Sequence, residues 1–434
     1  MKKRIFILSA AVIFLFTSCA ESNQGRDIAY THNIYIEAAV STSKNEPKPS
    51  VSEETGSILE EETIPAETEV SEVPALTFSD EQLRSGTLYL SGREQFVVSK
   101  NKNIITIILD AADNTYVRSL LKNNPGAFRG FEDFTLYDNT CSVFDSTFQS
   151  VTQIYSGILS RPIGKVSDWN DEAWSSKTAN EFYRRFHKAG YKMNIYADAN
   201  LDPRQLIGKL DNLEVSSDPP DGRDFYHLNH TFRQQIGTMD YADNDYNYFT
   251  VQHIWGAHTP TDMDTFDQQM EYLLTIVREY MDKLKSLGVY DDATIIVMAD
   301  HGSHDLANYP DSTPMFMIKE PHRSSEEMKI SSAPIYFADL MSTYLVNAGL
   351  FDEETDRELF GSSIYDFDDD SVRERVANYR RVDKNYSTSG ISYLVPSYGY
   401  NVIYSYRYTG NTEDLLAEIR KWRPEIFWME EDAA

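Results

Sequence analysis

Hydrophobic residues in the middle of this chain follow two recurring patterns. Continuous apolar runs at 104–109 (IITIIL) and 293–299 (ATIIVMA) have the length of strands that are buried on both faces, as in a parallel sheet covered by helices. Between them, apolar residues from Phe266 to Leu284 repeat at spacings of three and four, which predicts a long amphipathic helix that ends near Gly288. Strands alternating with helices predict an α/β fold with a mixed, mostly parallel central sheet sandwiched by helices.

Further segments of the chain fit this alternation. A helical pattern at 179–189 precedes the short strand pattern at 191–197, and a strand pattern at 314–319 precedes the helical pattern at 333–349. From residue 379 the pattern changes, because 390–410 alternates aromatic and polar residues like a short antiparallel hairpin. We therefore predict one main folded domain at 81–378 and a small, β-rich α+β appendage at 379–434.

The N-terminus has the pattern of an exported protein. Lys2, Lys3 and Arg4 precede an apolar run at 5–16 that is too short to span a bilayer. The following FTSC resembles the bacterial lipoprotein cleavage box, which implies that 1–19 is a signal peptide and that Cys19 is the lipidation site. We expect anchoring to the outer face of the cytoplasmic membrane of a bacterial cell, or another extracytoplasmic location. The alternatives are a weak N-terminal anchor and a secreted protein.

Composition separates this anchor from the predicted domain. Residues 20–80 are rich in Ser, Thr, Glu and Pro, and no Lys or Arg occurs from Pro49 to Leu83. Such a segment cannot bury enough apolar area to offset its chain entropy, so we predict a disordered acidic tether. Over the whole chain 68 acidic residues outnumber 40 basic ones, giving a net charge of -28. This balance argues against a nucleic-acid partner, because phosphate binding requires a basic surface.

Acidic and imidazole side chains follow the two buried runs directly. Asp110 ends the first run, and Asp300 and His301 end the second. Ligand sites in α/β sheets lie at the carboxyl ends of the strands, and Asp and neutral His are usual ligands of divalent cations. These residues therefore predict a site for one divalent metal ion, whose identity stays open among manganese, zinc, magnesium and calcium. The alternative is a turn in which Asp300 is a cap.

A candidate nucleophile precedes a third amphipathic pattern. Apolar residues from Phe148 to Leu159 share a helical face, so the helix begins near 145–147 and Thr147 lies in its first turn. Backbone N–H groups and the helix dipole favour an anion there, and a cation-bound hydroxyl loses its proton more easily. Thr147 could therefore attack a phosphorus or sulfur centre. The alternative is that Thr147 caps the helix.

Four motifs together resemble a known family. They are NIITIILDA with Asp110, DSTFQSVTQIYSG with Thr147, HIWGAHTP with His253 and His258, and IIVMADHG with Asp300 and His301. In order and spacing they resemble the sulfatase-like branch of the alkaline phosphatase superfamily, and most closely the catalytic domains of lipoteichoic acid synthases and phosphoethanolamine transferases. The resemblance covers residues 100–350.

The resemblance implies a role for each of these residues. Asp110, Thr147, Asp300 and His301 would bind one divalent metal ion, and Thr147 would also be the nucleophile. His253 and His258 would contact the substrate, and we assign protonation of the leaving oxygen to His258, which suits an imidazole. The alternative for His253 is a core histidine at a strand end.

Departures from the family pattern restrict the reaction. Cys141 is followed by SVFD, which lacks the Pro and Arg of the sulfatase formylglycine motif, and no histidine follows His322 to bind a second metal. The resemblance thus implies an extracytoplasmic phosphotransferase or phosphoester hydrolase that acts on a phospholipid headgroup or a cell-envelope glycopolymer. The alternatives are a sulfatase and, from another class, an inactive module that binds envelope polymer.

Overall fold

The computed structural model describes residues 70–160, 166–197, 201–219, 225–303, 313–380 and 403–408. All of them belong to one unit, Tyr35–Ala434. The predicted lipidation site Cys19, residues 20–69 of the predicted tether and most of the predicted appendage lie outside the described residues. Within the described ranges, no helix combines the length and the apolar character that a membrane span requires.

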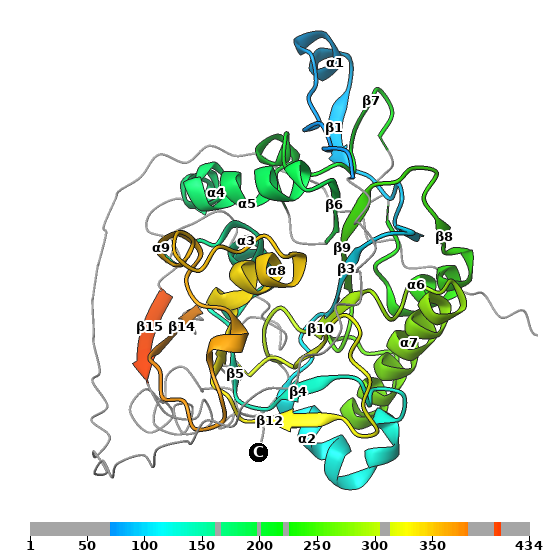
Figure 1. The fold of residues 1–434 in the computed structure, drawn as a ribbon, viewed down its shortest axis with the longest axis vertical. Coiled ribbons are helices and arrows are strands. Elements are labelled where there is room, and N and C mark those ends of the chain that lie inside the picture. Colours follow the sequence, from blue (N-terminus) through cyan, green and yellow to red (C-terminus); the bar gives the residue numbers. More distant parts are fainter. Residues whose placement is uncertain are drawn as a thin grey trace, which may run out of the picture. The chain divides into compact units, whose positions relative to one another are not determined.

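A seven-stranded sheet carries the fold (Figure 1). Its strands, in spatial order, are β12 (Lys329–Ser331), β4 (Thr135–Tyr137), β11 (Phe316–Lys319), β10 (Thr294–Met298), β3 (Asn103–Leu109), β9 (Asn247–Ile254) and β6 (Tyr191–Tyr196). Strand β11 is antiparallel to both of its neighbours, and the other neighbouring pairs are parallel. The predicted mixed, mostly parallel sheet is confirmed.

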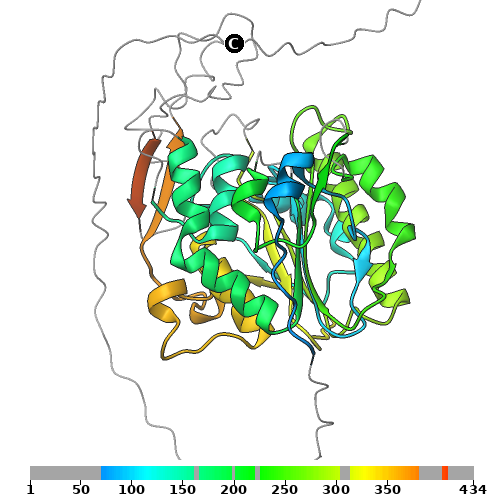
Figure 2. The ribbon, with the colours of Figure 1, turned by 90° about the horizontal axis from the view of Figure 1, so that it is seen from above.

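Helices cover both faces of this sheet, as Figure 2 shows. One face carries α3 (Thr147–Ser156), α4 (Val166–Ser175), α5 (Lys177–Lys188) and α8 (Leu340–Ala348). The other carries α2 (Asn114–Asn123), α6 (Asn229–Gln235) and α7 (Phe266–Ser286). Two short helices, α1 (Asp80–Ser85) and α9 (Arg357–Phe360), complete the described set. The long predicted helix corresponds to α7, which begins after the N-cap Thr265.

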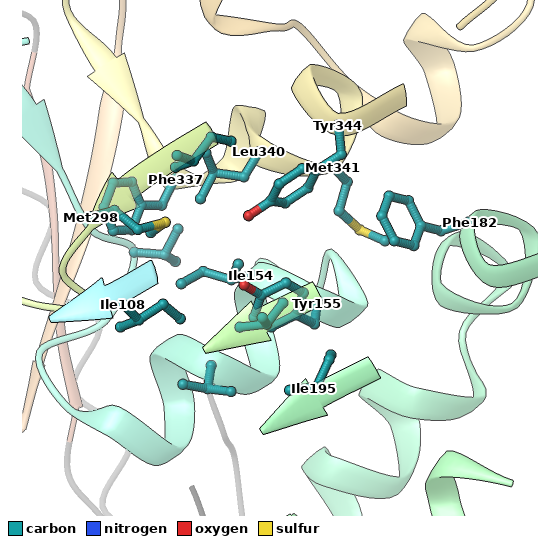
Figure 3. Close-up of a cluster of buried hydrophobic side chains, with 14 of the residues drawn as sticks. Ile108, Ile154, Tyr155, Phe182, Ile195, Met298, Phe337, Leu340, Met341 and Tyr344 are labelled. Carbon is teal, nitrogen blue, oxygen red and sulfur yellow. The ribbon is translucent and has the colours of Figure 1, made fainter. Parts of the chain in front are cut away.

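Two hydrophobic cores explain the continuous apolar runs. Side chains alternate between the two faces of a strand, so successive residues of β3 point into the two cores in turn. Ile104 and Ile108 pack in the core under α3, α5 and α8, whereas Ile105 and Ile107 pack in the core under α7. Figure 3 shows the first core, where Ile108 lies near side chains of α3 and α8. A strand covered on both faces is therefore mostly apolar, as the sequence pattern indicated, and the hydroxyl of the buried Thr106 lies 2.9 Å from that of Tyr344.

Smaller two-stranded sheets lie outside the central sheet. They are β1 (Thr87–Leu90) with β7 (Leu213–Ser216), β2 (Val97–Val98) with β8 (Asp240–Tyr241), β5 (Thr140–Cys141) with β13 (Ile335–Tyr336), and β14 (Arg375–Arg380) with β15 (Ile403–Tyr408). Strand β15 belongs to the predicted appendage, and its antiparallel partner is β14, which comes before the predicted hairpin. Through Asn378, β14 also bridges to Phe144, just before α3.

The structure corrects the end of the predicted tether. Residues 70–79 pack on the folded part, because Val73 is buried and its N–H donates to the carbonyl of His187 over 2.9 Å. Leu76 accepts a hydrogen bond from the N–H of Gly208, and Phe78 packs against the core under α3 and α5. The prediction of disorder rested on the average composition of residues 20–80, and the few apolar residues at its end did not change that average. The packed part of the chain therefore includes residues 70–79.

Candidate active site

The carboxyl ends of three parallel strands bring the predicted acidic and imidazole residues to one edge of the sheet. In the pairing register Ile108 of β3 lies between Met298 of β10 and His253 of β9. Asp110 therefore follows β3 at the level where Asp300 follows β10. The side chains of Asp110, His253 and Asp300 at this edge are all buried, and Asp300 is 0% exposed.

Asp110, Asp300 and His301 form a compact group of possible metal ligands. One ligand atom from each residue lies within 4.8 Å of those from the other two. His301 Nε2 is 3.6 Å from Asp110 Oδ1 and 3.5 Å from Asp300 Oδ2. His301 Nδ1 lies 2.6 Å from the carbonyl of Gly302, which can only accept, so Nδ1 carries the proton and donates. In the neutral ring the lone pair is then on Nε2, which faces the two carboxylates.

Thr147 joins this group from the first turn of α3. Ser146 occupies the N-cap position, and Thr147 is the first residue of the helix, so the alternative in which Thr147 is the cap is wrong. Its Oγ1 lies 3.2 Å from His301 Nε2 and 3.4 Å from Asp110 Oδ2. The side chain is half-buried, whereas the other three are enclosed. Thr147 is thus the residue of this group that is most exposed to solvent.

The two buried carboxylates require a positive charge. Burial raises the pKa of Asp300, and the negative charge of Asp110 raises it further. Burial also raises the pKa of Asp110, but its contact with His253 and the charges of His301, His253 and His258 outweigh burial and lower it. Among the described residues, Asp110 Oδ1 and Asp300 Oδ2 have no hydrogen-bond partner. Two orphaned carboxylate oxygens, one imidazole nitrogen and one hydroxyl suit a divalent cation.

His253 lies close to both carboxylates. Its Nε2 is 3.5 Å from Asp110 Oδ2 and 4.0 Å from Asp300 Oδ2, and the residue is 3% exposed. The side chain extends from the end of β9 toward the metal-type group, so it belongs to this site rather than to the apolar core. Its imidazole can balance the charge of the carboxylates.

His258 lies on the loop after β9 and is half-buried. Its Nδ1 lies 2.7 Å from the carbonyl of Thr259, which can only accept, so Nδ1–H is the donor. The ring packs edge-on against Trp255, with centroids 4.8 Å apart. Its charge is near enough to lower the pKa of Asp110. These features suit a general acid that serves a group held beside the carboxylates.

Two sets of residues around the site were not assigned a function from the sequence. Asp113 caps α2 through Thr115, and its Oδ2 accepts from the N–H of Ser303 at 3.3 Å and the hydroxyl of Thr313 at 2.9 Å. Asp113 thereby contacts Ser303, two residues after His301, and Thr313. The second set is the pair Asn229 and Gln269, which bind the loop that carries His258. No periodicity or motif marks either set, because their roles depend on contacts across the fold.

Cys141 and Asn114 are both buried in the folded part. Cys141 is 0% exposed in the short strand β5, and Asn114 donates to the hydroxyl of Thr140 over 2.9 Å. A formylglycine at Cys141 would not reach a solvent-borne substrate at this depth. The position thus agrees with the missing Pro and Arg of the sulfatase motif.

No protein-family model and no curated protein matches this chain. Several solved structures are similar in fold. The lipoteichoic acid synthase LtaP from Listeria monocytogenes is 14% identical, with 68% of this chain and 83% of that chain covered and a TM-score of 0.43. A protein in the alkaline phosphatase superfamily from Vibrio parahaemolyticus is 14% identical, with coverages of 66% and 74% and a TM-score of 0.43.

A third structure was solved with its substrate D-glucosamine-2-N,6-O-disulfate. It is 11% identical, covers 77% of this chain and 97% of its own, and has a TM-score of 0.47. At these identities the likeness concerns the fold, and the residues of this chain must carry the functional assignment.

Proposed function

We propose that this protein is a metal-dependent phosphotransferase or phosphoester hydrolase in which Thr147 is the nucleophile. The observation that carries the proposal is the position of the Thr147 hydroxyl, at the N-terminus of α3 and 3.2 Å from His301 Nε2. A helix N-terminus presents N–H groups that can hold an anionic phosphoryl group. A candidate nucleophile, a candidate anion site and a group of possible metal ligands would therefore meet at one point.

Asp110, Asp300, His301 and the Thr147 hydroxyl would hold the divalent cation. When bound, the cation supplies charge stabilisation for the phosphoryl oxygens and favours ionisation of the hydroxyl. Thr147 Oγ1 gives its proton to the solvent and forms a bond to the phosphorus, and the bond to the leaving oxygen breaks as His258 Nε2 gives that oxygen a proton. His258 then takes a proton from the water or alcohol that attacks phospho-Thr147, and the bond between the phosphorus and Thr147 Oγ1 breaks as Oγ1 regains a proton from the solvent. Water gives hydrolysis, and an alcohol gives transfer.

We assign the enzyme to the outer surface of a bacterial cell on the basis of the sequence. The lipobox-like segment at Cys19 and the acidic tether would leave the catalytic domain within reach of the membrane. A phospholipid headgroup or a cell-envelope glycopolymer is then the accessible substrate class. The net charge of -28 supports the exclusion of nucleic acid.

The first test follows the covalent step by intact mass. The chain without residues 1–19 is incubated with Mn²⁺ and a lipid extract that carries phosphodiester headgroups, then quenched and peptide-mapped. We expect a phospho-group adduct on Thr147, because the proposed intermediate is a phosphothreonine. Thr147→Ala should lose the adduct and about 10⁴-fold in turnover while it keeps its fold, whereas Thr147→Ser retains a hydroxyl and should retain the adduct.

Other outcomes would contradict this function. Turnover in Thr147→Ala comparable to the wild type would remove Thr147 as the nucleophile. Turnover of sulfate esters in place of phosphodiesters would indicate the sulfatase. A folded protein that binds envelope polymer but neither metal nor any reactive ester would indicate the inactive binding module.

A further inference from the structure

Two buried amide side chains converge on the loop that carries His258. Asn229 comes from the first turn of α6 and Gln269 from the first turn of α7, and they are 1% and 0% exposed. Asn229 Nδ2 donates to the carbonyl of Gly256 over 2.9 Å, and Gln269 Nε2 donates to the same oxygen over 2.7 Å. Both amides therefore hold the backbone two residues before His258.

The same two amides also hold the far end of this loop. Asp262 Oδ2 accepts from Asn229 Nδ2 at 2.7 Å and from Gln269 Nε2 at 3.4 Å. Gln269 Oε1 accepts from the N–H groups of Asp262 and Met263, at 3.0 and 3.1 Å. On the near side, Asn229 Oδ1 accepts from the N–H of Gly256 at 2.8 Å. The two ends of the loop are thereby tied to one pair of side chains.

The helices that supply these amides are fixed to each other. The rings of Phe232 in α6 and Tyr280 in α7 stack with centroids 6.0 Å apart and planes 9° apart. Arg233 and Glu279 form a bidentate ion pair between the same helices, with Nε 2.7 Å from Oε2. Figure 1 shows α6 beside α7. The amides thus act from a rigid pair of helices, not from mobile loops.

The held loop is in turn locked to a proposed metal ligand. The N–H of Ala257 donates to the carbonyl of Asp110 over 2.8 Å, and the N–H of Asp110 donates to the carbonyl of Ile254 over 3.2 Å. A Cβ atom on Gly256 would overlap the backbone nitrogen of Asp110, so the two backbones are in direct contact. The position of His258 relative to Asp110 therefore depends on this short stretch and on what holds it.

We propose that Asn229 and Gln269 are positioning residues that set the His258 imidazole for protonation of the leaving oxygen. The inference rests on the proposed function, because it specifies how one step of that reaction is controlled. In that step the P–O electron pair moves to the leaving oxygen, and that oxygen takes the proton from His258 Nε2. The ring becomes neutral, with Nδ1–H still directed to the carbonyl of Thr259.

This role makes a prediction that a merely structural role does not make. An ester with a weakly basic leaving group departs without a proton, whereas a more basic leaving oxygen needs the acid. Loss of the positioning amides should therefore slow esters with basic leaving groups selectively. A general loss of folding or metal binding would slow all esters by the same factor.

The test compares 4-nitrophenyl methyl phosphate with phenyl methyl phosphate in the full-length, Mn²⁺-loaded protein. In Gln269→Leu we expect kcat for the phenyl ester to fall about 100-fold and kcat for the 4-nitrophenyl ester to fall less than about threefold. The matched control is Gln268→Leu, an exposed neighbour on the same helix, which should leave both rates unchanged. Asn229→Asp, which removes the other donor with little change in shape, should reproduce the selectivity.

A second measurement does not require turnover. Histidine ¹⁵N NMR of the substrate-free protein reports which nitrogen of His258 carries the proton. At a pH at which the ring is neutral, we expect one tautomer, protonated at Nδ1, in the wild type and in Gln268→Leu, and a mixture in Gln269→Leu and Asn229→Asp. A wild type that turns over neither ester would contradict the proposed function, and the NMR comparison would still decide the positioning role. Equal loss for both esters, or an unchanged tautomer in both variants, would overturn the inference.

Discussion

At the scale of single residues, Asp300 is held where its negative charge is unfavourable. It is 0% exposed, its pKa is raised by burial and by the charge of Asp110, and its Oδ2 has no hydrogen-bond partner among the described residues. A buried negative charge costs free energy of folding. A divalent ion held beside Asp300 would offset this cost.

Asp300→Asn should separate these two effects. Because the amide keeps the shape and removes the charge, we expect the metal-free variant to be at least as stable as the metal-free wild type, with Mn²⁺ affinity reduced at least about 100-fold. Urea unfolding with EDTA measures the stability, and calorimetric titration measures the affinity. Asp292→Asn, at a 57% exposed carboxylate on a turn, is the matched control and should change neither. Wild-type affinity in Asp300→Asn would contradict the proposed ligand set.

At the scale of elements, the approach of the β9–α7 loop to the end of β3 builds the site. Gly256 has a φ of +63° and lies against the backbone of Asp110. A glycine adopts this left-handed conformation easily, and the absence of a side chain allows the close contact. Gly288, after α7, has a similar φ of +70°, but a Cβ added there would meet no atom within 4 Å. The two glycines share a left-handed backbone and differ in the close approach.

Gly256→Ala and Gly288→Ala therefore form a matched pair. Gly288→Ala should cost about 1 kcal/mol of unfolding free energy, the usual cost of a left-handed non-glycine residue. Gly256→Ala should cost several kcal/mol, on the order of an overpacked core, and should reduce phosphodiester turnover because the loop with His258 must move away from Asp110. Urea unfolding and steady-state rates measure both. Equal stabilities of the two variants would show that the two backbones do not approach each other so closely.

Several elements follow from the sequence with a clear physical cause. Strands β3 and β10 are buried throughout and mostly apolar because helices cover both of their faces, and α7 has one apolar stripe because only one side is covered. The pairing of β15 with β14 does not follow in this way, because a short alternating segment can pair with any exposed edge. The packing of residues 70–79 is hidden for a related reason, since their few apolar side chains depend on distant partners.

At the scale of the whole molecule, stability should depend on pH through Asp339. This buried carboxyl accepts hydrogen bonds from Arg373 and from the N–H of Tyr336, yet burial raises its pKa to about 6. Between the unfolded pKa near 4 and pH 6, the folded state holds the proton and the unfolded state does not. The contribution of this group to stability is therefore present below about pH 4 and is lost as the pH rises through about 6.

Asp339→Asn should remove this slope. We expect the difference in unfolding free energy between wild type and variant to change by up to about 3 kcal/mol from pH 4 to pH 6, with the wild type relatively more stable at the lower pH. The loss of the Arg373 partner should lower the stability of the variant equally at both pH values. Urea unfolding at a series of pH values checks this, and parallel profiles for the two proteins would contradict it.

The sequence by itself determined the alternation of buried strands and amphipathic helices, and with it the strand ends at which Asp110, Asp300 and His301 meet. It also placed Thr147 in the first turn of a helix, because hydrophobic periodicity is a local property that each segment carries alone. Only the tertiary structure decided that His253 lies beside the carboxylates and that Asn229 and Gln269 hold the loop of His258. Those contacts join residues far apart in sequence, and a buried amide shows its partners only once the chain has brought them together.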